Sequence, residues 1–392
     1  MTEDRPADSI AGTSALITDV DRRKALPIIR ALGKEGVRVI GLSYRKRPMG
    51  GMSRYCQSTF RCPDYRHQPE AFLERLKEVC TQQRPDVLYP LEDVSLDLCV
   101  GRPEFWEPYT RALLPSQTAF RQTRDKWLTT EAAREAGIAV PKTVCPQSQQ
   151  EAELAAKTWE GPAVIKPRES SGSRGLQYVD RPAEIPEVFR ATTEAFGPTI
   201  IQERIPAEGS GLGVSILMDR RHEPVAAFGH RRLREYPITG GPSTYCESHQ
   251  DAELTSQSIR FLKNLKFVGV AMIEYKLDVR TGRPVLMEIN PRFWGSLDLA
   301  ICAGVNFPLL YHRLALGMDI TYNKEYPLGV RYRWLLGDLL HFLSKLKKLQ
   351  RCPGFFKFPQ SGTFYDFSQD DPWPTVGMIA EGLRRLVRGK EH

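Results

Sequence analysis

The stretch VLMEINPRFWGS, residues 285–296, decides how the rest of this chain is interpreted. Its apolar start is typical of a buried strand. Glu288 and Asn290 stand two residues apart, so on a strand both side chains project from the same face. A carboxylate beside a carboxamide oxygen suits magnesium. Pro291 ends the strand because it cannot donate to a sheet ladder, and Arg292 adds a permanent cation. An ordinary strand end followed by a turn is the alternative.

A second acid closes the preceding apolar segment. Glu274 lies in GVAMIEYKLD, residues 269–278, which is joined to the first stretch by VRTGRP, residues 279–284. That connection has the composition of a hairpin turn. A hairpin would bring Glu274 to Glu288 and Asn290, and the three side chains would then supply oxygen ligands to one magnesium ion, completed by phosphates and water.

A lysine and a loop of small residues lie further toward the N-terminus. Lys166 ends the apolar strand AVIKP, and the segment RESSGSRGLQYV, residues 168–179, follows it. Small residues allow consecutive backbone N–H groups to approach an anion closely, which suits a phosphate cover. They are Ser170, Ser171, Gly172, Ser173 and Gly175. A plain hairpin turn is the alternative, and the loop is not the GxxxxGK[ST] type because no helix follows it with a lysine in place.

Two further segments offer polar groups beside apolar runs. In TIIQERI, residues 199–205, Gln202 and Glu203 could hydrogen-bond an adenine edge or ribose hydroxyls, or could belong to an edge strand with alternating exposure. In GHRRLREYPITGGPSTYCES, residues 229–248, a basic run precedes a Gly-Gly loop. Arginine binds carboxylate and phosphoryl groups bidentately, and Arg231 is the preferred candidate; a solvated basic hairpin is the alternative.

The chain around these motifs divides into parts of different character. Residues 14–20, 22–36 and 37–43 read as strand, helix and strand, and a helix at 69–83 and a strand at 86–90 continue the pattern. This alternation predicts a parallel, doubly wound βαβ layout. The first turn lacks GxGxxG, so NAD is not expected. From about residue 116 the hydrophobic period approaches two, which predicts a largely antiparallel sheet with a few helices.

Composition limits the functional classes. The chain has 392 residues, so two or three domains are expected. Its net charge of +8 is not gathered in one basic tract, so nucleic acid is not expected as a partner. The acidic, polar N-terminus is no signal peptide, and no apolar run reaches the ~18 residues of a membrane span. Eight scattered cysteines indicate reduced thiols in a cytoplasmic protein.

The C-terminal part of the chain has a different pattern. RWLLGDLLHFLSKLKKLQR, residues 333–351, predicts an amphipathic helix with a basic polar face. A terminal helix that packs on the body of the protein is the preferred interpretation, and a role at a membrane surface or with a partner is the alternative.

Taken in order, the motifs resemble the ATP-grasp superfamily, and within it carboxylate–amine ligases with a carbamoyl-phosphate-synthetase-like ATP-binding domain. The order is Lys126 before a helix, Lys166 at a strand end, the loop 170–175, QERI at 202–205, then Glu274 and EINPR at 288–292. The resemblance covers roughly residues 12–320. It implies α/β and α+β architecture, namely an ATP-grasp fold behind an N-terminal Rossmann-like preATP-grasp domain.

The resemblance also implies a domain division and roles for residues. Residues 1–115 would be the preATP-grasp domain, 116–320 the ATP-grasp domain with two subdomains that close on ATP, and 321–392 a C-terminal extension. The implied nucleotide-binding set is Lys126, Lys166, Ser171, Gly172, Ser173, Gln202, Glu203 and Ile205. Glu274, Glu288 and Asn290 would hold Mg²⁺, with Mn²⁺ as a substitute, and Arg292 and Arg231 would act on the reacting groups.

The expected reaction is amide or peptide bond formation between a small-molecule carboxylate and an amine, through an acyl phosphate, with release of ADP and phosphate. Arg292 would stabilise the oxyanion. Two alternatives stay open: a bicarbonate-using carboxylase of the same superfamily and a non-catalytic ATP-binding module. The sequence does not name the substrates, and a homodimer is one option for the assembly.

Overall fold

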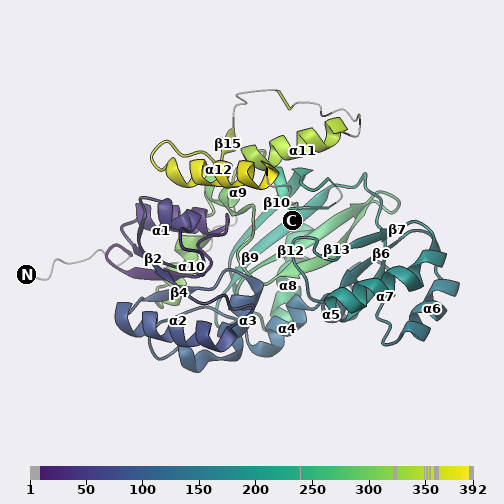
Figure 1. The fold of residues 1–392 in the computed structure, drawn as a ribbon, viewed down its shortest axis with the longest axis horizontal. Helices are drawn as coiled ribbons and strands as arrows, with labels where there is room; N and C mark the ends of the chain where they lie inside the picture. The colour runs from purple at the N-terminus through teal and green to yellow at the C-terminus, as the bar shows by residue number, and fades with distance from the viewer. Residues whose placement is uncertain are drawn as a thin grey trace, which may run out of the picture.

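The computed structural model describes residues 9–238, 240–320, 325–347, 349, 352, 355–356 and 362–387. Three sheets organise this part of the chain (Figure 1). The N-terminal sheet lies at the left of the view, a small sheet at the right, and a seven-stranded sheet runs between them. Both α/β and α+β parts are therefore present, as the sequence predicts.

The N-terminal sheet is fully parallel, with strand order β3-β2-β1-β4. Its strands are β1 (Ser14–Ile17), β2 (Arg38–Ser43), β3 (Cys56–Arg61) and β4 (Val87–Tyr89). Its helices are α1 (Ala25–Lys34), α2 (Pro69–Gln83) and α3 (Asp93–Gly101). This arrangement confirms the predicted doubly wound layout. The prediction omitted β3, whose alternating half-buried and exposed side chains mark a sheet edge.

The strand order creates a switch point at the carboxyl ends of β1 and β4. The chain leaves β1 toward β2 on one side, whereas β4 lies on the other side of β1. In open α/β sheets, ligands bind where the connections diverge in this way. The loops that follow β1 and β4 therefore stand at a position suited to a binding site.

The central sheet has strand order β13-β12-β9-β10-β11-β14-β15 and is antiparallel except for the last pair. The strands are β9 (Gly211–Met218), β10 (Pro224–Glu235), β11 (Ser243–Ser248), β12 (Gly269–Asp278), β13 (Arg283–Asn290), β14 (Arg331–Arg333) and β15 (Thr363–Tyr365). The hairpin predicted between 269–278 and 285–290 is confirmed as the β12–β13 pair.

The small sheet has order β5-β8-β6-β7 and is antiparallel. It consists of β5 (Thr143–Val144), β6 (Ala163–Pro167), β7 (Gln177–Val179) and β8 (Thr199–Glu203), and is covered by α6 (Gln149–Lys157) and α7 (Ile185–Phe196). Its apolar core is separate from those of the other sheets.

The remaining helices cover the central sheet or join it to its neighbours. They are α4 (Gln117–Arg124), α5 (Lys126–Glu135), α8 (Ala252–Asn264), α9 (Leu297–Cys302), α10 (Phe307–Ala315), α11 (Leu335–Lys347) and α12 (Trp373–Val387), with short 3-10 turns at Met49–Met52, Pro103–Phe105 and Pro182–Glu184. One core runs continuously from the N-terminal sheet into the central sheet. Within this core Tyr89 of β4 packs on Tyr311 and Phe293. The N-terminal sheet and the central sheet are therefore in direct contact next to residue 292.

The C-terminal part joins the body of the protein through β14 and the two last helices. Helix α11 packs against β10 and β11, which agrees with the preferred interpretation of the basic helix. The prediction extended that helix to residue 351, but residues 348, 350 and 351 lie outside the described residues. None of the described helices has the length and apolar character needed to cross a membrane.

Candidate functional site

Two carboxylates and a carboxamide meet on one face of the β12–β13 hairpin. Glu274 stands directly opposite Glu288, and Met272 stands opposite Asn290, so all four side chains share a face. The Asn290 Nδ2 donates to Glu274 Oε1 at 3.0 Å and to Glu288 Oε1 at 3.4 Å. The structure therefore brings the three predicted metal ligands together, and we call Glu274, Glu288 and Asn290 the acidic group.

A β-bulge in the β12–β13 pair places Glu274 and Glu288 on the same face of the sheet. From the turn, the ladder pairs Asp278 with Arg283 and continues to Tyr275 opposite Leu286. Unbroken, it would place Met287 opposite Glu274, and Glu288 would then face the other side of the sheet. The register instead shifts by one residue between Glu274 and Tyr275, which turns Glu288 onto the face of Glu274.

The electrostatics of this group suit a cation. Burial raises the pKa of Glu274, Arg232 opposes that shift, and the neighbouring Glu288 raises the pKa further. Both carboxylates remain partly exposed, at 22% and 28%. Two carboxylates with one amide fit a hard divalent cation whose other ligands are phosphate oxygens and water. Among the described residues no group of three His, Cys, Asp or Glu side chains could hold a metal, so a metal site here would combine the two carboxylates with the Asn290 amide.

The two predicted lysines approach the acidic group from the other side. Lys126 begins α5, where the Asp125 side chain caps the helix, and its Nζ lies 3.6 Å from Glu288 Oε2. Lys166 is the last but one residue of β6 and is only 6% exposed. Burial and, to a smaller extent, the nearby Lys126 lower the pKa of Lys166 to about 8, and Glu288 and Glu274 oppose that shift. The structure thus brings both lysines close to the carboxylates, and their contact with ATP phosphates stays a prediction.

The loop of small residues at 170–175, which we call the Gly/Ser loop, lies between β6 and β7 and contacts Lys126. The Lys126 Nζ donates to the Ser170 carbonyl at 2.7 Å. Gly172 and Ser173 both have positive φ, at 63° and 64°. The Ser173 hydroxyl donates to the carbonyl of Gly240 in the β10–β11 connection. Ser171 belongs to the same loop, which lies beside both lysines and can cover a bound anion.

The segment at the end of β8 is already engaged in protein contacts. The Gln202 side chain is buried and donates to Thr143 Oγ1 at 2.9 Å. Glu203 pairs with Arg280 at 2.7 Å, and the Ile205 carbonyl accepts from Lys276 Nζ at 3.4 Å. The segment thus joins the small sheet to β12, and the nucleotide-binding role of these three residues stays a prediction.

Arg231 is not brought to the site. It stands opposite Glu247 on β11 and forms an ion pair with that side chain. Its neighbour His230 is paired with Gly213, which is paired in turn with Glu274, so the His230 and Glu274 side chains project from the same face of the sheet. Arg231 is the next residue and therefore projects from the opposite face. Arg232 projects toward the acidic group instead, and its Nη2 donates to Glu274 Oε2 at 3.0 Å. The sequence analysis missed Arg232 because the choice between adjacent arginines depends on strand parity.

Arg292 lies between the acidic group and the N-terminal sheet. Its Nε donates to Asp93 Oδ1 at 2.8 Å. Burial acts to lower the pKa of Arg292, but Asp93 and Glu92 outweigh it and raise the pKa. Lys24 pairs with Glu92 at 2.8 Å. The sequence analysis did not select Lys24, Glu92 or Asp93, although the acids follow an apolar strand as Glu288 does.

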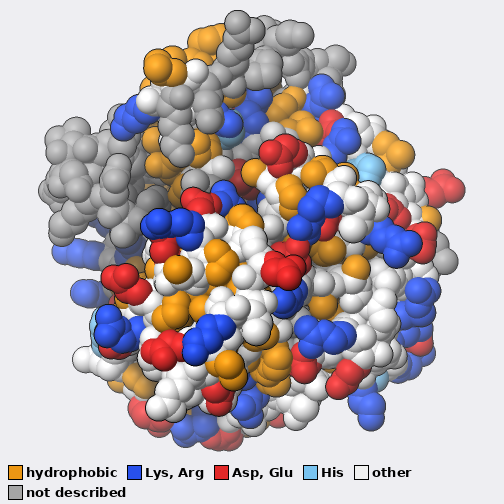
Figure 2. Space-filling model, turned by 90° about the vertical axis from the view of Figure 1, so that its right-hand side faces the viewer, with side chains coloured by type: hydrophobic (Ala, Val, Ile, Leu, Met, Phe, Trp, Pro, Cys, Tyr) orange, Lys and Arg blue, Asp and Glu red, His pale blue; other side chains and the backbone are white. Residues whose placement is uncertain are grey.

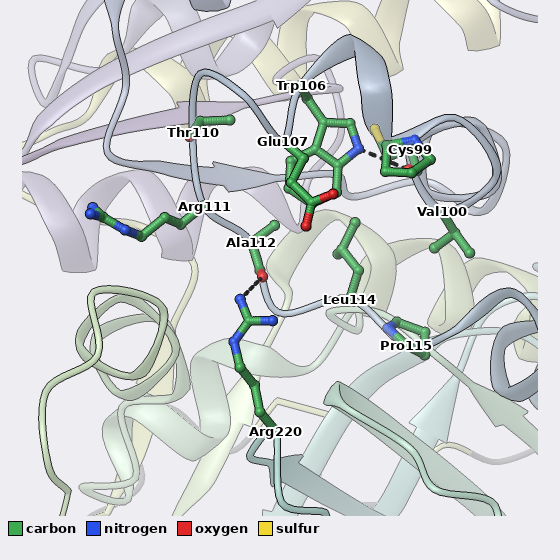
Figure 3. Close-up of a pocket in the computed structure, with 11 residues that line it drawn as sticks. Cys99, Val100, Trp106, Glu107, Thr110, Arg111, Ala112, Leu114, Pro115 and Arg220 are labelled. Carbon is green, nitrogen blue, oxygen red and sulfur yellow. Dashed lines mark hydrogen bonds between the residues drawn. The ribbon is translucent and has the colours of Figure 1, made fainter.

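A cavity lies elsewhere, between α3, the segment that follows it and the β9–β10 turn (Figure 3). It measures about 270 Å³ and is lined by Trp106, Glu107, Thr110 and Arg220 among others. Arg220 donates to the Ala112 carbonyl at 2.9 Å, and Trp106 donates to the Cys99 carbonyl at 2.8 Å. The Trp106 and Arg220 side chains are thus engaged in protein contacts, whereas the Thr110 hydroxyl has no hydrogen-bond partner among the described residues. The side of the molecule that carries the small sheet, at the right of Figure 1, mixes both charge signs on its surface (Figure 2).

Comparison with protein families identifies the middle of the chain. A family model for an ATP-grasp domain matches residues 123–296. Curated proteins that are similar include acetyl-CoA carboxylase 1 of Oryza sativa subsp. japonica, 29% identical over 38% of this chain and 7% of the relative. The acetyl-CoA carboxylase of Dictyostelium discoideum is 26% identical over 45% of this chain and 8% of the relative. The chain thus spans less than a tenth of these relatives.

Solved structures give the same fold over most of the chain. The biotin carboxylase domain of Hydrogenobacter thermophilus 2-oxoglutarate carboxylase aligns with a TM-score of 0.67 and 15% identity, over 81% of this chain and 73% of that one. N5-carboxyaminoimidazole synthetase of Staphylococcus aureus gives 0.63 and 14%, over 83% and 82%. L-amino acid ligase of Bacillus licheniformis gives 0.62 and 16%, over 80% and 76%. At these identities the likeness concerns the fold.

Proposed function

We propose, from the premise that the chain is an ATP-grasp enzyme with its ATP-grasp domain at residues 123–296, that it joins a carboxylate to an amine. The observation that carries the ATP- and Mg²⁺-dependent part of this proposal is the single sheet face where Glu274, Glu288 and Asn290 meet, flanked by Lys126 and Arg292. The order of the motifs and the fold shared with an L-amino acid ligase favour an amine as the second substrate. The substrates would be small molecules, and the cytoplasmic location expected from the cysteine pattern is part of the proposal.

The chain's own residues divide the work of binding. Lys126 and Lys166 would neutralise ATP phosphates beneath the Gly/Ser loop, and that loop would keep water from the reacting groups. Glu274, Glu288 and Asn290 would hold Mg²⁺, which supplies further neutralisation of the phosphates when bound. Arg232 fixes Glu274 through its hydrogen bond and so orients one of these ligands.

The reaction would proceed in two steps. A carboxylate oxygen forms a bond to the γ-phosphorus while the bond from that phosphorus to the bridging oxygen breaks and ADP leaves. The amine nitrogen then forms a bond to the acyl carbon, phosphate leaves with the electron pair of the broken C–O bond, and nitrogen loses a proton. Arg292 would stabilise negative charge on the acyl oxygen in the second step.

A bicarbonate-using activity is the second candidate. It is favoured by the match to acetyl-CoA carboxylases and by the fold shared with a biotin carboxylase domain. In that case bicarbonate replaces the organic carboxylate as the acceptor of the γ-phosphoryl group. The two candidates use the same metal and phosphate contacts and differ only in the acceptor.

The nucleotide product and a trapping reagent test the proposal. With the correct carboxylate from a panel, ATP, Mg²⁺ and hydroxylamine should give a hydroxamate and an equal amount of ADP, because an acyl phosphate is open to attack by hydroxylamine. Arg292→Ala should suppress both products by about 100-fold or more. Arg283→Ala, exposed on the same strand, is the matched control.

Other products would lead to other conclusions. AMP in place of ADP would exclude an acyl phosphate, since it indicates adenylation. ADP release that requires bicarbonate and ignores amines would replace the ligase by the second candidate. ATP binding without any turnover across the panel would favour a non-catalytic module.

A further inference from the structure

The switch point of the N-terminal sheet contacts the arginine proposed to act in catalysis. The loop after β1 carries Arg22 and Lys24, and the loop after β4 carries Glu92 and Asp93. Asp93 Oδ1 holds Arg292, and Lys24 pairs with Glu92. The position at which α/β sheets bind ligands therefore adjoins the reacting end of the ATP-grasp domain.

Two buried polar atoms of opposite character have no hydrogen-bond partner among the described residues. They are the Asp93 Oδ2, an acceptor, and the Arg22 Nε, a donor. The nearest carboxylate oxygens to Arg22 Nε lie at 3.6 Å on Asp21 and 3.9 Å on Glu92, beyond hydrogen-bond length. A buried unpaired group costs free energy, so a partner from outside the protein is favoured at each.

The surrounding charges keep the Asp93 carboxylate and the Arg22 guanidinium in their ionised forms. Burial acts to raise the pKa of Asp93, but Arg292 and Lys24 outweigh it and lower the pKa. Burial acts to lower the pKa of Arg22, and Glu92 and Asp21 reverse that shift. The Arg22 side chain is 36% exposed and the Asp93 side chain 16%, so other atoms of both side chains reach solvent while the Arg22 Nε and the Asp93 Oδ2 are covered in the free protein.

We propose that these residues bind the amine substrate and that this amine also carries an anionic group, a carboxylate or a phosphate. We name Arg22, Lys24, Glu92 and Asp93 the switch-point site. An amine N–H would donate to Asp93 Oδ2, and the Arg22 Nε would donate to the anionic group. Because Asp93 Oδ1 holds Arg292, one carboxylate would set the nitrogen beside the cation that faces the acyl oxygen. This inference rests on the proposed ligase function.

Binding of defined amines tests the ligand class. Calorimetry on the full chain, with Mg²⁺ and a non-hydrolysable ATP analogue present, would compare the standard amino acids, phosphoethanolamine and ethylamine. At least one anionic amine should bind at least tenfold more tightly than ethylamine. Binding confined to amino acids identifies a carboxylate, and binding confined to phosphoethanolamine identifies a phosphate. If no anionic amine binds better than ethylamine, the inference is wrong.

Substitutions locate the site. Arg22→Gln and Asp93→Asn should each weaken binding of that amine about tenfold or more while nucleotide affinity stays unchanged. Arg47→Gln, exposed, and Asp97→Asn, one turn along α3 from Asp93, are the matched controls. Arg22→Lys keeps the charge without the Nε donor and should show an intermediate loss, which guards against a folding defect in Arg22→Gln.

The outcomes separate this inference from the proposed function. Unchanged amine affinity in both Arg22→Gln and Asp93→Asn would overturn the switch-point site, even if ADP and hydroxamate still form. Failure of ADP and hydroxamate formation, with amine binding that the two substitutions abolish, would overturn the ligase function and retain the binding site.

Discussion

At the scale of single residues, the main feature of the candidate site is the pair of neighbouring carboxylates, Glu274 and Glu288. Glu274 and Glu288 repel each other in the free protein, and burial raises the pKa of Glu274 in the same sense. Lys126 and Arg232 offset only part of that repulsion. A divalent cation would therefore bind with a favourable electrostatic contribution, and its ligands are not selected for the stability of the free protein.

Glu288→Gln tests this interpretation. Removing one negative charge should weaken Mg²⁺-dependent turnover by more than about 100-fold, the upper range for residues that only support metal ligands. The melting temperature should not fall, because the substitution also relieves repulsion with Glu274. Activity titrated against Mg²⁺, together with thermal unfolding, measures both effects.

The control for this prediction is Glu194→Gln, an exposed residue on α7. It should change neither quantity. Wild-type turnover of Glu288→Gln at limiting Mg²⁺ would remove Glu288 from the metal set.

Lys166 gives a prediction on pH. Its pKa in the folded protein is about 8, below the ordinary 10.5, so the free protein loses this proton as the pH rises through 8. A bound polyphosphate favours the charged lysine and raises that pKa. ADP affinity, measured in EDTA, should therefore fall up to tenfold per pH unit above pH 8, until the pKa of the bound form is reached.

Lys166→Met should weaken ADP binding at pH 7 and abolish this fall. The exposed Lys157→Met should leave the profile unchanged. The lysine's contribution to stability has the opposite sign, because the folded state holds fewer protons than the unfolded state between pH 8 and 10.5. Stability should therefore rise with pH in that window. An ADP profile that is the same in Lys166→Met and wild type would return Lys166 to a structural role.

At the scale of secondary-structure elements, strand register governs which residues reach the site. The bulge in β12–β13 places Glu288 beside Glu274, and strand parity in β10 sends Arg232, not Arg231, to the same face. A shift of one residue exchanges the two faces of a strand. The sequence could not indicate which of the two arginines shares the face of Glu274, because that depends on the register of β10.

The loop between β6 and β7 yields a prediction at this scale. A Cβ on Gly175 would lie 2.7 Å from Pro167 Cγ and 3.0 Å from Phe196 Cδ2, and φ is 75°. Gly175→Ala should therefore cost more than the ~1 kcal/mol typical of a positive-φ glycine and should weaken nucleotide binding by distorting the loop.

Gly172→Ala is the matched control. Its φ is 63°, but no atom lies within 4 Å of the added Cβ, so only the backbone cost of about 1 kcal/mol applies. Urea unfolding and ADP titration compare the two variants. Equal losses would show that the packing around Gly175 does not shape the loop.

At the scale of the whole molecule, the site lies where separate units meet. Helix α5 contributes Lys126, and the small sheet contributes Lys166 and the Gly/Ser loop. The central sheet contributes the acidic group. Asp93 comes from the N-terminal sheet. The aromatic core of Tyr89, Phe293 and Tyr311 fixes the N-terminal unit below Arg292. An enzyme that joins two substrates with ATP needs such a junction, because three reactants must approach one point.

The local elements and the candidate site residues could be predicted from the amino-acid sequence. Apolar runs beside Glu274, Glu288 and Lys166 predict strands, although Glu274 lies inside β12 and not at its end. The order of these motifs indicates the ATP-grasp fold. The alternation in residues 14–90 predicts the parallel sheet, because hydrophobic period depends only on near neighbours along the chain.

The tertiary structure alone decided which of these groups meet. The β12–β13 bulge, the face taken by Arg232 and the contact of Asp93 with Arg292, 199 residues apart in sequence, follow from packing between distant segments. Such contacts leave no periodic signal, since each depends on register and on how complete sheets pack. For the same reason Arg22, Lys24 and Glu92 became candidates only when the carboxyl edge of the N-terminal sheet was seen beside Arg292.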